Sequence, residues 1–103
     1  MLAILVVGGP GAEEAEPASA IEVLHARDAD EAVEKLGRNR RIDAVLVLDE
    51  PARTVAAIRE DIVAPPPIFL PRDAPPVPGA RRLEAPGETG ALVAAVAAEI
   101  SGR

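Results

Sequence analysis

The stretch Ala44-Val-Leu-Val-Leu48 is a continuous apolar run, and Asp49, Glu50 and Pro51 follow it directly. A run without polar alternation is typical of a strand that is covered on both faces, as in a parallel sheet. Proline suits the first turn of a helix, because its missing N–H would have no intrahelical partner there. The stretch therefore predicts a buried central strand that leads at once into a helix.

Four further short segments are strand candidates. The first, Leu2–Val7, is as continuous as the central run, and the glycines and proline after it break the pattern sharply. The other three candidates are Ile21–Leu24, Ile68–Leu70 and Arg81–Glu84. Together with the central run they predict a sheet of five strands.

The segment after the second strand candidate has clear helix signals. Asp28 can cap the start of a helix, and the acidic residues after it suit the first turn. Ala32, Val33 and Leu36 share one face at helical spacing. Gly37 fits a left-handed stop, so the helix is predicted to end there.

Two more helices follow from apolar spacing. Val55, Ile58 and Ile62 predict a helix that begins at Pro51, and the prolines at 65–67 are expected to end it. The last helix is predicted over 90–100. Its apolar stripe consists of Leu92, Val93, Val96 and Ile100.

The order of these elements determines the expected fold class. Strands that alternate with helices predict an α/β domain with a parallel sheet and right-handed crossovers. A chain of 103 residues has the size of one domain. We therefore expect a single domain that spans residues 1–103.

Composition excludes several classes of function. Phe69 is the one aromatic residue, so the stacking platforms of single-strand and RNA readers are missing. The net charge of −6 would repel nucleic acid. There is no cysteine, and the single histidine, His25, cannot build a histidine-based metal site alone. We therefore expect no nucleic-acid partner, no metal site and no cofactor.

The first apolar run also bears on localisation. Leu2–Val7 is too short for a membrane span or a signal peptide, and no basic region precedes it. We expect a cytoplasmic protein without membrane attachment.

These segments, taken together, resemble the receiver domain of bacterial response regulators. The matching stretches are Ala3–Val7 for its first strand, Val23–Leu36 for its second strand and helix, Asp43–Asp49 for its third strand, and Gly79–Pro86 followed by Leu92 for its fifth strand and last helix. The resemblance implies a flavodoxin-like fold, an open parallel five-stranded sheet of order 2-1-3-4-5. It also implies that Asp49 stands at the phosphoacceptor position.

The chain departs from the receiver pattern at the residues that carry phosphorylation. The acidic pair that holds Mg²⁺ in receivers is replaced by Gly8 and Gly9. The hydroxyl position is Pro71, and the lysine position is Ala85. Phosphoryl transfer to a carboxylate needs a cation to neutralise the developing charge, and Mg²⁺ needs several oxygen ligands. Asp49 is therefore expected to be a vestigial phosphoacceptor.

The connections are shorter than those of a receiver. Too few residues separate the first two strand candidates for a full first helix, and 71–79 leaves little room for a fourth. We expect both helices to be shortened or missing. A missing crossover helix leaves part of the sheet open, so the proline-rich loop or a partner must cover it.

The leading hypothesis is a non-catalytic pseudo-receiver, not an enzyme, that acts in signalling or scaffolding by binding another protein or itself. The expected interface, or homodimer contact, lies within 71–100 and has an apolar centre with a polar rim. Its candidate residues are Pro71, Pro75, Pro76, Arg81, Arg82 and Leu83.

Two alternatives stay open. Gly8, Gly9 and Gly11 form a glycine-rich turn past the first strand, where parallel sheets bind ligands, so a small ligand or nucleotide phosphate is one alternative. The glutamates that follow would repel an anion, and no Walker or dinucleotide pattern is present. The other alternative is an atypical receiver that is phosphorylated on Asp49.

Overall fold

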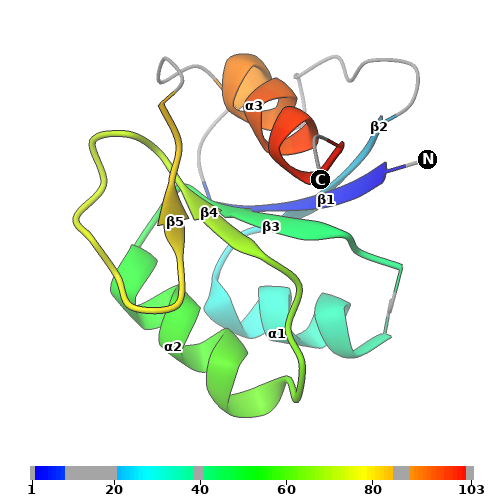
Figure 1. Ribbon diagram of the computed structural model, residues 1–103. Helices are drawn as coiled ribbons and strands as arrows, with labels where there is room; N and C mark the ends of the chain where they lie inside the picture. Colours follow the sequence, from blue (N-terminus) through cyan, green and yellow to red (C-terminus); the bar gives the residue numbers. More distant parts are fainter. Residues whose placement is uncertain (1, 9–20, 39–40, 85–88, 102–103) are drawn as a thin grey trace.

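The computed structural model describes residues 2–8, 21–38, 41–84 and 89–101, which form a parallel sheet with helices on both faces (Figure 1). The strand order is β2-β1-β3-β4-β5, as predicted. The elements are β1 (Leu2–Val7), β2 (Ile21–Ala26), α1 (Ala29–Arg38), β3 (Ala44–Val47), α2 (Pro51–Asp61), β4 (Ile68–Leu70), β5 (Arg81–Arg82) and α3 (Thr89–Ser101). This is a flavodoxin-like arrangement, so the predicted fold class is confirmed.

The buried strands divide their side chains between two apolar layers. Leu5 and Val7 of β1 lie in the layer under α1 and α2, whereas Ile4 and Val6 lie in the layer under α3. Figure 1 shows α1 and α2 on one side of the sheet and α3 on the other. Side chains alternate along a strand, so a continuous apolar run is needed where both faces are covered.

The proline-rich loop covers part of the sheet in place of a fourth helix. Residues 71–80 are all described, and they form turns and extended chain between β4 and β5. Ala74, Val77 and Ala80 are half-buried and pack against the layer under α1 and α2. The loop also lies beside α2, where an Arg59 Nη1–H donates to the Pro78 carbonyl over 3.4 Å. The expected loss of the fourth helix is confirmed, whereas the expected shortening or loss of the first helix concerns residues that the structure does not describe.

Helix α1 begins as predicted but ends later. Asp28 Oδ1 accepts a hydrogen bond from the Glu31 N–H at 2.9 Å, which confirms the cap. The prediction that Gly37 ends the helix is wrong, because the helix continues to Arg38. Gly37 has open space around it and no positive φ, and an ion pair of 3.0 Å joins Arg38 to Glu34. Basic residues also suit the last turn of a helix.

Helix α2 begins at Pro51 as predicted, but it ends at Asp61. The prediction that the prolines at 65–67 end it is wrong in position, because Ile62 already has an extended backbone with φ −108°. The Ile62 N–H still donates to the Ile58 carbonyl at 2.9 Å. This bond keeps the Ile62 side chain against the core layer under α1 and α2.

Helix α3 is the third helix of the described residues. Leu92, Val93 and Val96 of the predicted stripe are buried, whereas Ile100, its fourth member, is half-buried against the same layer. They pack over β1 and β3 together with Phe69 and Leu83. In the described part of the chain, none of the helices combines the length and the apolar character that crossing a membrane requires.

Candidate functional site

Gly8 and Asp49 meet at the carboxyl edge of the sheet. Gly8 follows β1 directly and is buried, with φ +76°. A β-carbon added to Gly8 would lie 2.5 Å from the Asp49 Cβ and 3.3 Å from the Asp49 backbone nitrogen. Real β-carbons do not approach so closely, and L-residues rarely adopt this φ. Gly8 is therefore required by the position of Asp49.

Asp49 is exposed and sits at the junction of β3 and α2. Its Oδ1 accepts the Glu50 N–H at 3.1 Å, and its carbonyl accepts the Thr54 hydroxyl at 3.3 Å. Thr54 is 2 % exposed and is the buried polar side chain of this region. Its hydroxyl thus serves to join the first turn of α2 to the end of the strand.

Glu50, the N-terminal cap of α2, has a left-handed backbone with φ 42° and ψ 59°. Its side chain does not cap the helix but forms an ion pair of 3.7 Å with Arg53. A non-glycine residue in this region carries local strain. The sharp turn follows from the direct step from a buried strand into a helix that begins with Pro51.

This edge does not fit the Mg²⁺ site of a receiver. Gly8 stands where the acidic pair would begin, and the approach of Asp49 leaves no room for a carboxylate side chain there. Among residues 2–8, 21–38, 41–84 and 89–101, no three histidine, cysteine, aspartate or glutamate side chains gather closely enough to hold a metal ion. Pro71, at the hydroxyl position, is half-buried, and Ala85 lies outside the described residues.

The glycine turn is described only at Gly8. The Gly8 N–H donates to the Ala26 carbonyl at 2.7 Å, so this amide is occupied and does not point at a ligand. Gly9 and Gly11 lie outside the described residues. The ligand hypothesis therefore stays a prediction that concerns those two glycines.

Some residues of the predicted partner surface are exposed in the structure, and one is buried. Pro75 and Pro76 are exposed on the loop, and Pro71 is half-buried. Leu83, however, is 4 % exposed and packs in the core layer under α3. Its inclusion in a surface is wrong, because the chain turns this residue inward just after the edge strand.

The two arginines of β5 lie on the surface at the edge of the sheet. An ion pair of 3.3 Å joins Arg81 Nη1 to Glu99 of α3, and Arg82 Nη1 donates to the Ala74 carbonyl at 3.5 Å. One arginine thus holds α3 and the other holds the proline-rich loop. Both remain exposed, so they also stay available to a partner.

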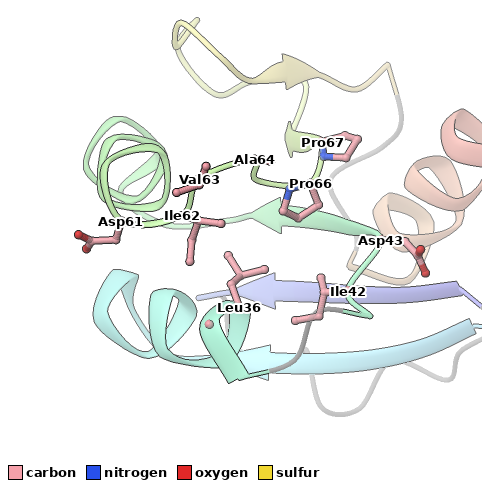
Figure 2. A pocket seen from close by; sticks show the side chains of 10 residues that line it. Leu36, Ile42, Asp43, Asp61, Ile62, Val63, Ala64, Pro66 and Pro67 are labelled. Carbon is pink, nitrogen blue, oxygen red and sulfur yellow. The ribbon is translucent and has the colours of Figure 1, made fainter.

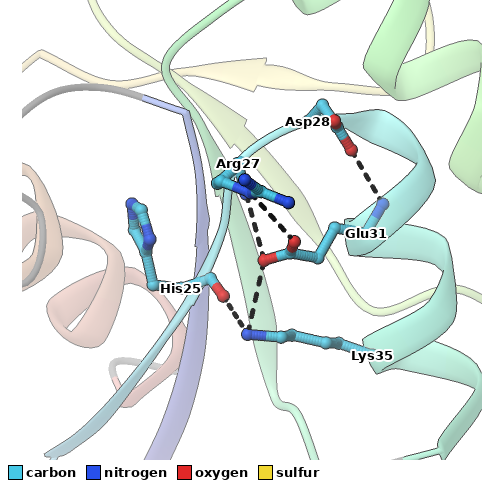
Figure 3. Close-up of polar contacts among 5 residues, drawn as sticks. All are labelled: His25, Arg27, Asp28, Glu31 and Lys35. Carbon is cyan, nitrogen blue, oxygen red and sulfur yellow. Dashed lines mark hydrogen bonds and ion pairs between the residues drawn. The ribbon is translucent and has the colours of Figure 1, made fainter.

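A polar cluster at the start of α1 was not predicted (Figure 3). Glu31 accepts from Arg27 Nε at 3.3 Å, and its Oε1 lies 3.7 Å from Lys35 Nζ. Lys35 also donates to the His25 carbonyl. Desolvation raises the pKa of Glu31, but the Arg27 hydrogen bonds and the nearby cations outweigh it, so the pKa is lowered overall. The spacing of four residues between the three charges is the signal that could have revealed the cluster.

The imidazole of His25 points away from this cluster (Figure 3). Its Nε2 is buried and has no hydrogen-bond partner. Its alignment with Val6 in the β1–β2 register places it on the side of the sheet that α3 covers. Within the described part of the chain, no acid or hydroxyl forms a hydrogen bond with this nitrogen.

A hollow of about 670 Å³ lies at the opposite, amino edge of the sheet (Figure 2). It opens between the C-terminal ends of α1 and α2 and the segments that lead into β3 and β4. Its lining residues are Leu36, Gly37, Ile42, Asp43, Asp61, Ile62, Val63, Ala64, Pro66 and Pro67. Sequence reasoning missed it, because three separate segments build it.

Comparison with family models, with curated proteins and with solved structures finds no match to this chain. The fold is therefore established by the structure alone.

Proposed function

We propose that the chain is a non-catalytic, receiver-like binding module that is not regulated by phosphorylation of Asp49. The observation that carries the proposal is the contact between Gly8 and Asp49, in which a β-carbon on Gly8 would lie 2.5 Å from the Asp49 Cβ. The strand order 2-1-3-4-5 supports the likeness to a receiver. A fold alone does not determine a function, so the residues at the carboxyl edge of the sheet decide between the alternatives.

Electrostatics supports the loss of phosphorylation. Transfer of a phosphoryl group to a carboxylate brings negative charge onto negative charge, and catalysis depends on cations placed beforehand. The Asp49 carboxylate accepts the Glu50 N–H, and Glu50 adds a second negative charge beside it. Arg53, on the first turn of α2, is already paired with Glu50. The positive charge of Arg53 is thus taken up by Glu50, so it does not favour phosphoryl transfer to Asp49.

The loop and the edge strand support a role in binding. Pro75 and Pro76 are exposed on a segment that packs on its own core through Ala74 and Val77. A loop that is already held in place loses little conformational entropy when it is bound. Arg82 supplies a charged rim next to it and is anchored to the same loop. These features fit an interface at this edge of the sheet.

Photo-crosslinking tests the proposal in an extract of the cells that produce the protein. A photo-reactive amino acid replaces Pro75, and a matched control carries it at Glu22, which is exposed on the opposite edge strand. We expect a discrete adduct from the Pro75 position only. Its yield should not change when Mg²⁺ and acetyl phosphate are added, or when Asp49→Asn is introduced.

Two results would contradict the proposal. One is the absence of any adduct specific to the Pro75 position. The other is an adduct whose yield responds to acetyl phosphate in the native protein but not in the Asp49→Asn variant, since this would mean that Asp49 is a working switch.

A further inference from the structure

The proline-rich loop has a three-residue pattern of exposure. Ala74 and Val77 are half-buried and pack against the core layer under α1 and α2. Pro75, Pro76 and Pro78 are exposed. Figure 1 shows this loop at the edge of the sheet, beside β5 and next to α2. A polyproline II helix has three residues per turn, so side chains three positions apart lie on one ridge. The pattern therefore fits such a helix with one ridge on the core and its two proline ridges in solvent.

The sequence restricts the backbone of this segment to extended conformations. Proline holds its own φ near about −65° and disfavours the helical region for the residue before it. Every residue from Ala74 to Pro78 either is a proline or precedes one. Residues 75–77 lie outside the helices, strands and turns of the structure. These restrictions favour the polyproline II conformation, whose φ is about −75°.

Two arginines hold the ends of the segment. Arg82 Nη1 donates to the Ala74 carbonyl at 3.5 Å, and Arg59 Nη1 donates to the Pro78 carbonyl at 3.4 Å. A β-carbon added to Gly79 would lie 2.5 Å from Arg59 Nη1, so the loop rests directly on that side chain. The free protein thus already holds the prolines in place. Binding them therefore costs little conformational entropy.

We infer that residues 74–78 are the ligand of a groove lined by aromatic side chains on a partner protein. Grooves of this kind bind Pro-x-x-Pro segments and exploit the fact that the polyproline II helix is already formed. Pro75 and Pro78 have this spacing on one ridge, and Pro76 belongs to the second. Charges of both signs stand beside the segment, since Arg72 and Asp73 precede it. The proline surface, and not charge, therefore identifies the partner.

A second copy of the chain cannot supply that groove. Phe69 is the one aromatic residue, and its side chain is 1 % exposed in the core layer under α3. The partner is therefore a different protein. The chain also contains no tryptophan and no tyrosine, so the tryptophan emission of a complex comes from the partner's groove alone.

Purified domains with aromatic grooves test the inference on the full chain. A Src-homology 3 domain and a WW domain serve as the two probes. We expect the native chain to change the tryptophan emission of at least one probe in a saturable manner. A proline-rich peptide that occupies the same groove should reverse the change when it is added in excess. In the ¹⁵N-labelled chain, the probe should shift the backbone amide signals of Ala74, Val77 and Gly79.

Variants separate the proline ridges from the rest of the surface. Pro76→Ala combined with Pro78→Ala removes a proline from each exposed ridge and should weaken binding at least about tenfold. Pro78→Ala alone should weaken it about three- to tenfold. These side chains are exposed, so the fold should persist, and circular dichroism checks this. Pro67→Ala, at an exposed proline just before β4, is the matched control and should bind like the native chain.

The inference is overturned if neither probe responds, if the double variant binds as well as the native chain, or if the shifted amides lie outside 71–80. It rests on the proposed function and names the chemistry of its partner. The crosslinking variant keeps Pro76 and Pro78, so it retains a proline on each exposed ridge. A Pro75 adduct without any response from the probes would overturn the inference alone. Absence of the adduct would instead overturn the proposed function.

Discussion

The backbone of Gly8 lies against Asp49 so closely that the 2.5 Å between an added β-carbon and the Asp49 Cβ leaves space for no side chain at position 8. The contact joins the ends of two adjacent strands, since the Leu48 N–H donates to the Val7 carbonyl at 2.9 Å just before it. The absence of a side chain at position 8 and the close packing of Asp49 therefore have the same structural cause.

The first prediction concerns this contact. Gly8→Ala combines a left-handed backbone with a collision against Asp49, so the free energy of unfolding should fall by about 2–4 kcal/mol. Urea unfolding followed by circular dichroism measures it. Gly37→Ala is the matched control, because Gly37 lies in α1 with open space around it. That change should stabilise the chain by up to about 1 kcal/mol. Equal stability of Gly8→Ala and the native protein would disprove the packing argument.

A substitution at Glu50 is expected to raise the free energy of unfolding instead of lowering it. Its φ of 42° is unfavourable for a residue with a β-carbon, so Glu50→Gly should raise the free energy of unfolding by about 0.5–1 kcal/mol. Glu60→Gly, in the last turn of α2, should instead lower it by about 1 kcal/mol. Thermal and urea unfolding of both variants provide the comparison. A loss of stability in Glu50→Gly would mean that its pairing with Arg53 outweighs the strain.

The strands, their order and their two-sided burial could be predicted, because continuous apolar runs such as 44–48 are compatible with few other arrangements. The end of α1 could not be predicted. Glycine often ends a helix, but an exposed glycine such as Gly37 is also tolerated within one. The contact of Gly8 with Asp49 joins residues about forty positions apart, and no local pattern encodes such an approach. The hollow was missed for the same reason, since residues from 36 to 67 converge only after folding.

Leu83 tests the corrected assignment of the partner surface. Because it is buried under α3 with Phe69 and Leu92, Leu83→Ala should lower the free energy of unfolding by about 2–4 kcal/mol. Pro75→Ala, on the exposed part of the loop, should change it by less than about 1 kcal/mol. Differential scanning calorimetry distinguishes the two variants. If the Leu83→Ala variant is as stable as the native chain, Leu83 is not part of the core, and its assignment to the partner surface would be restored.

The pKa of Glu31 predicts a pH dependence. Its pKa in the folded chain lies below the ordinary value of 4.5, so the ionised form is favoured by folding. The contribution is present above about pH 4.5 and is lost as the pH falls through the lower folded pKa. We expect the stability difference between the native chain and Glu31→Gln to shrink over this acidic range. Urea unfolding at a series of pH values measures it, and added salt should reduce the difference, because the partners are exposed. A difference that is constant with pH would contradict the assigned cause.

The most direct test of the central claim is the intact mass of the protein after incubation with Mg²⁺ and acetyl phosphate, with a phosphorylatable receiver in the same tube as a positive control. If Gly8 and Asp49 pack as described, the mass of this chain stays unchanged while that of the control gains a phosphoryl group. A gain of one phosphoryl group by this chain that disappears in the Asp49→Asn variant would contradict the account.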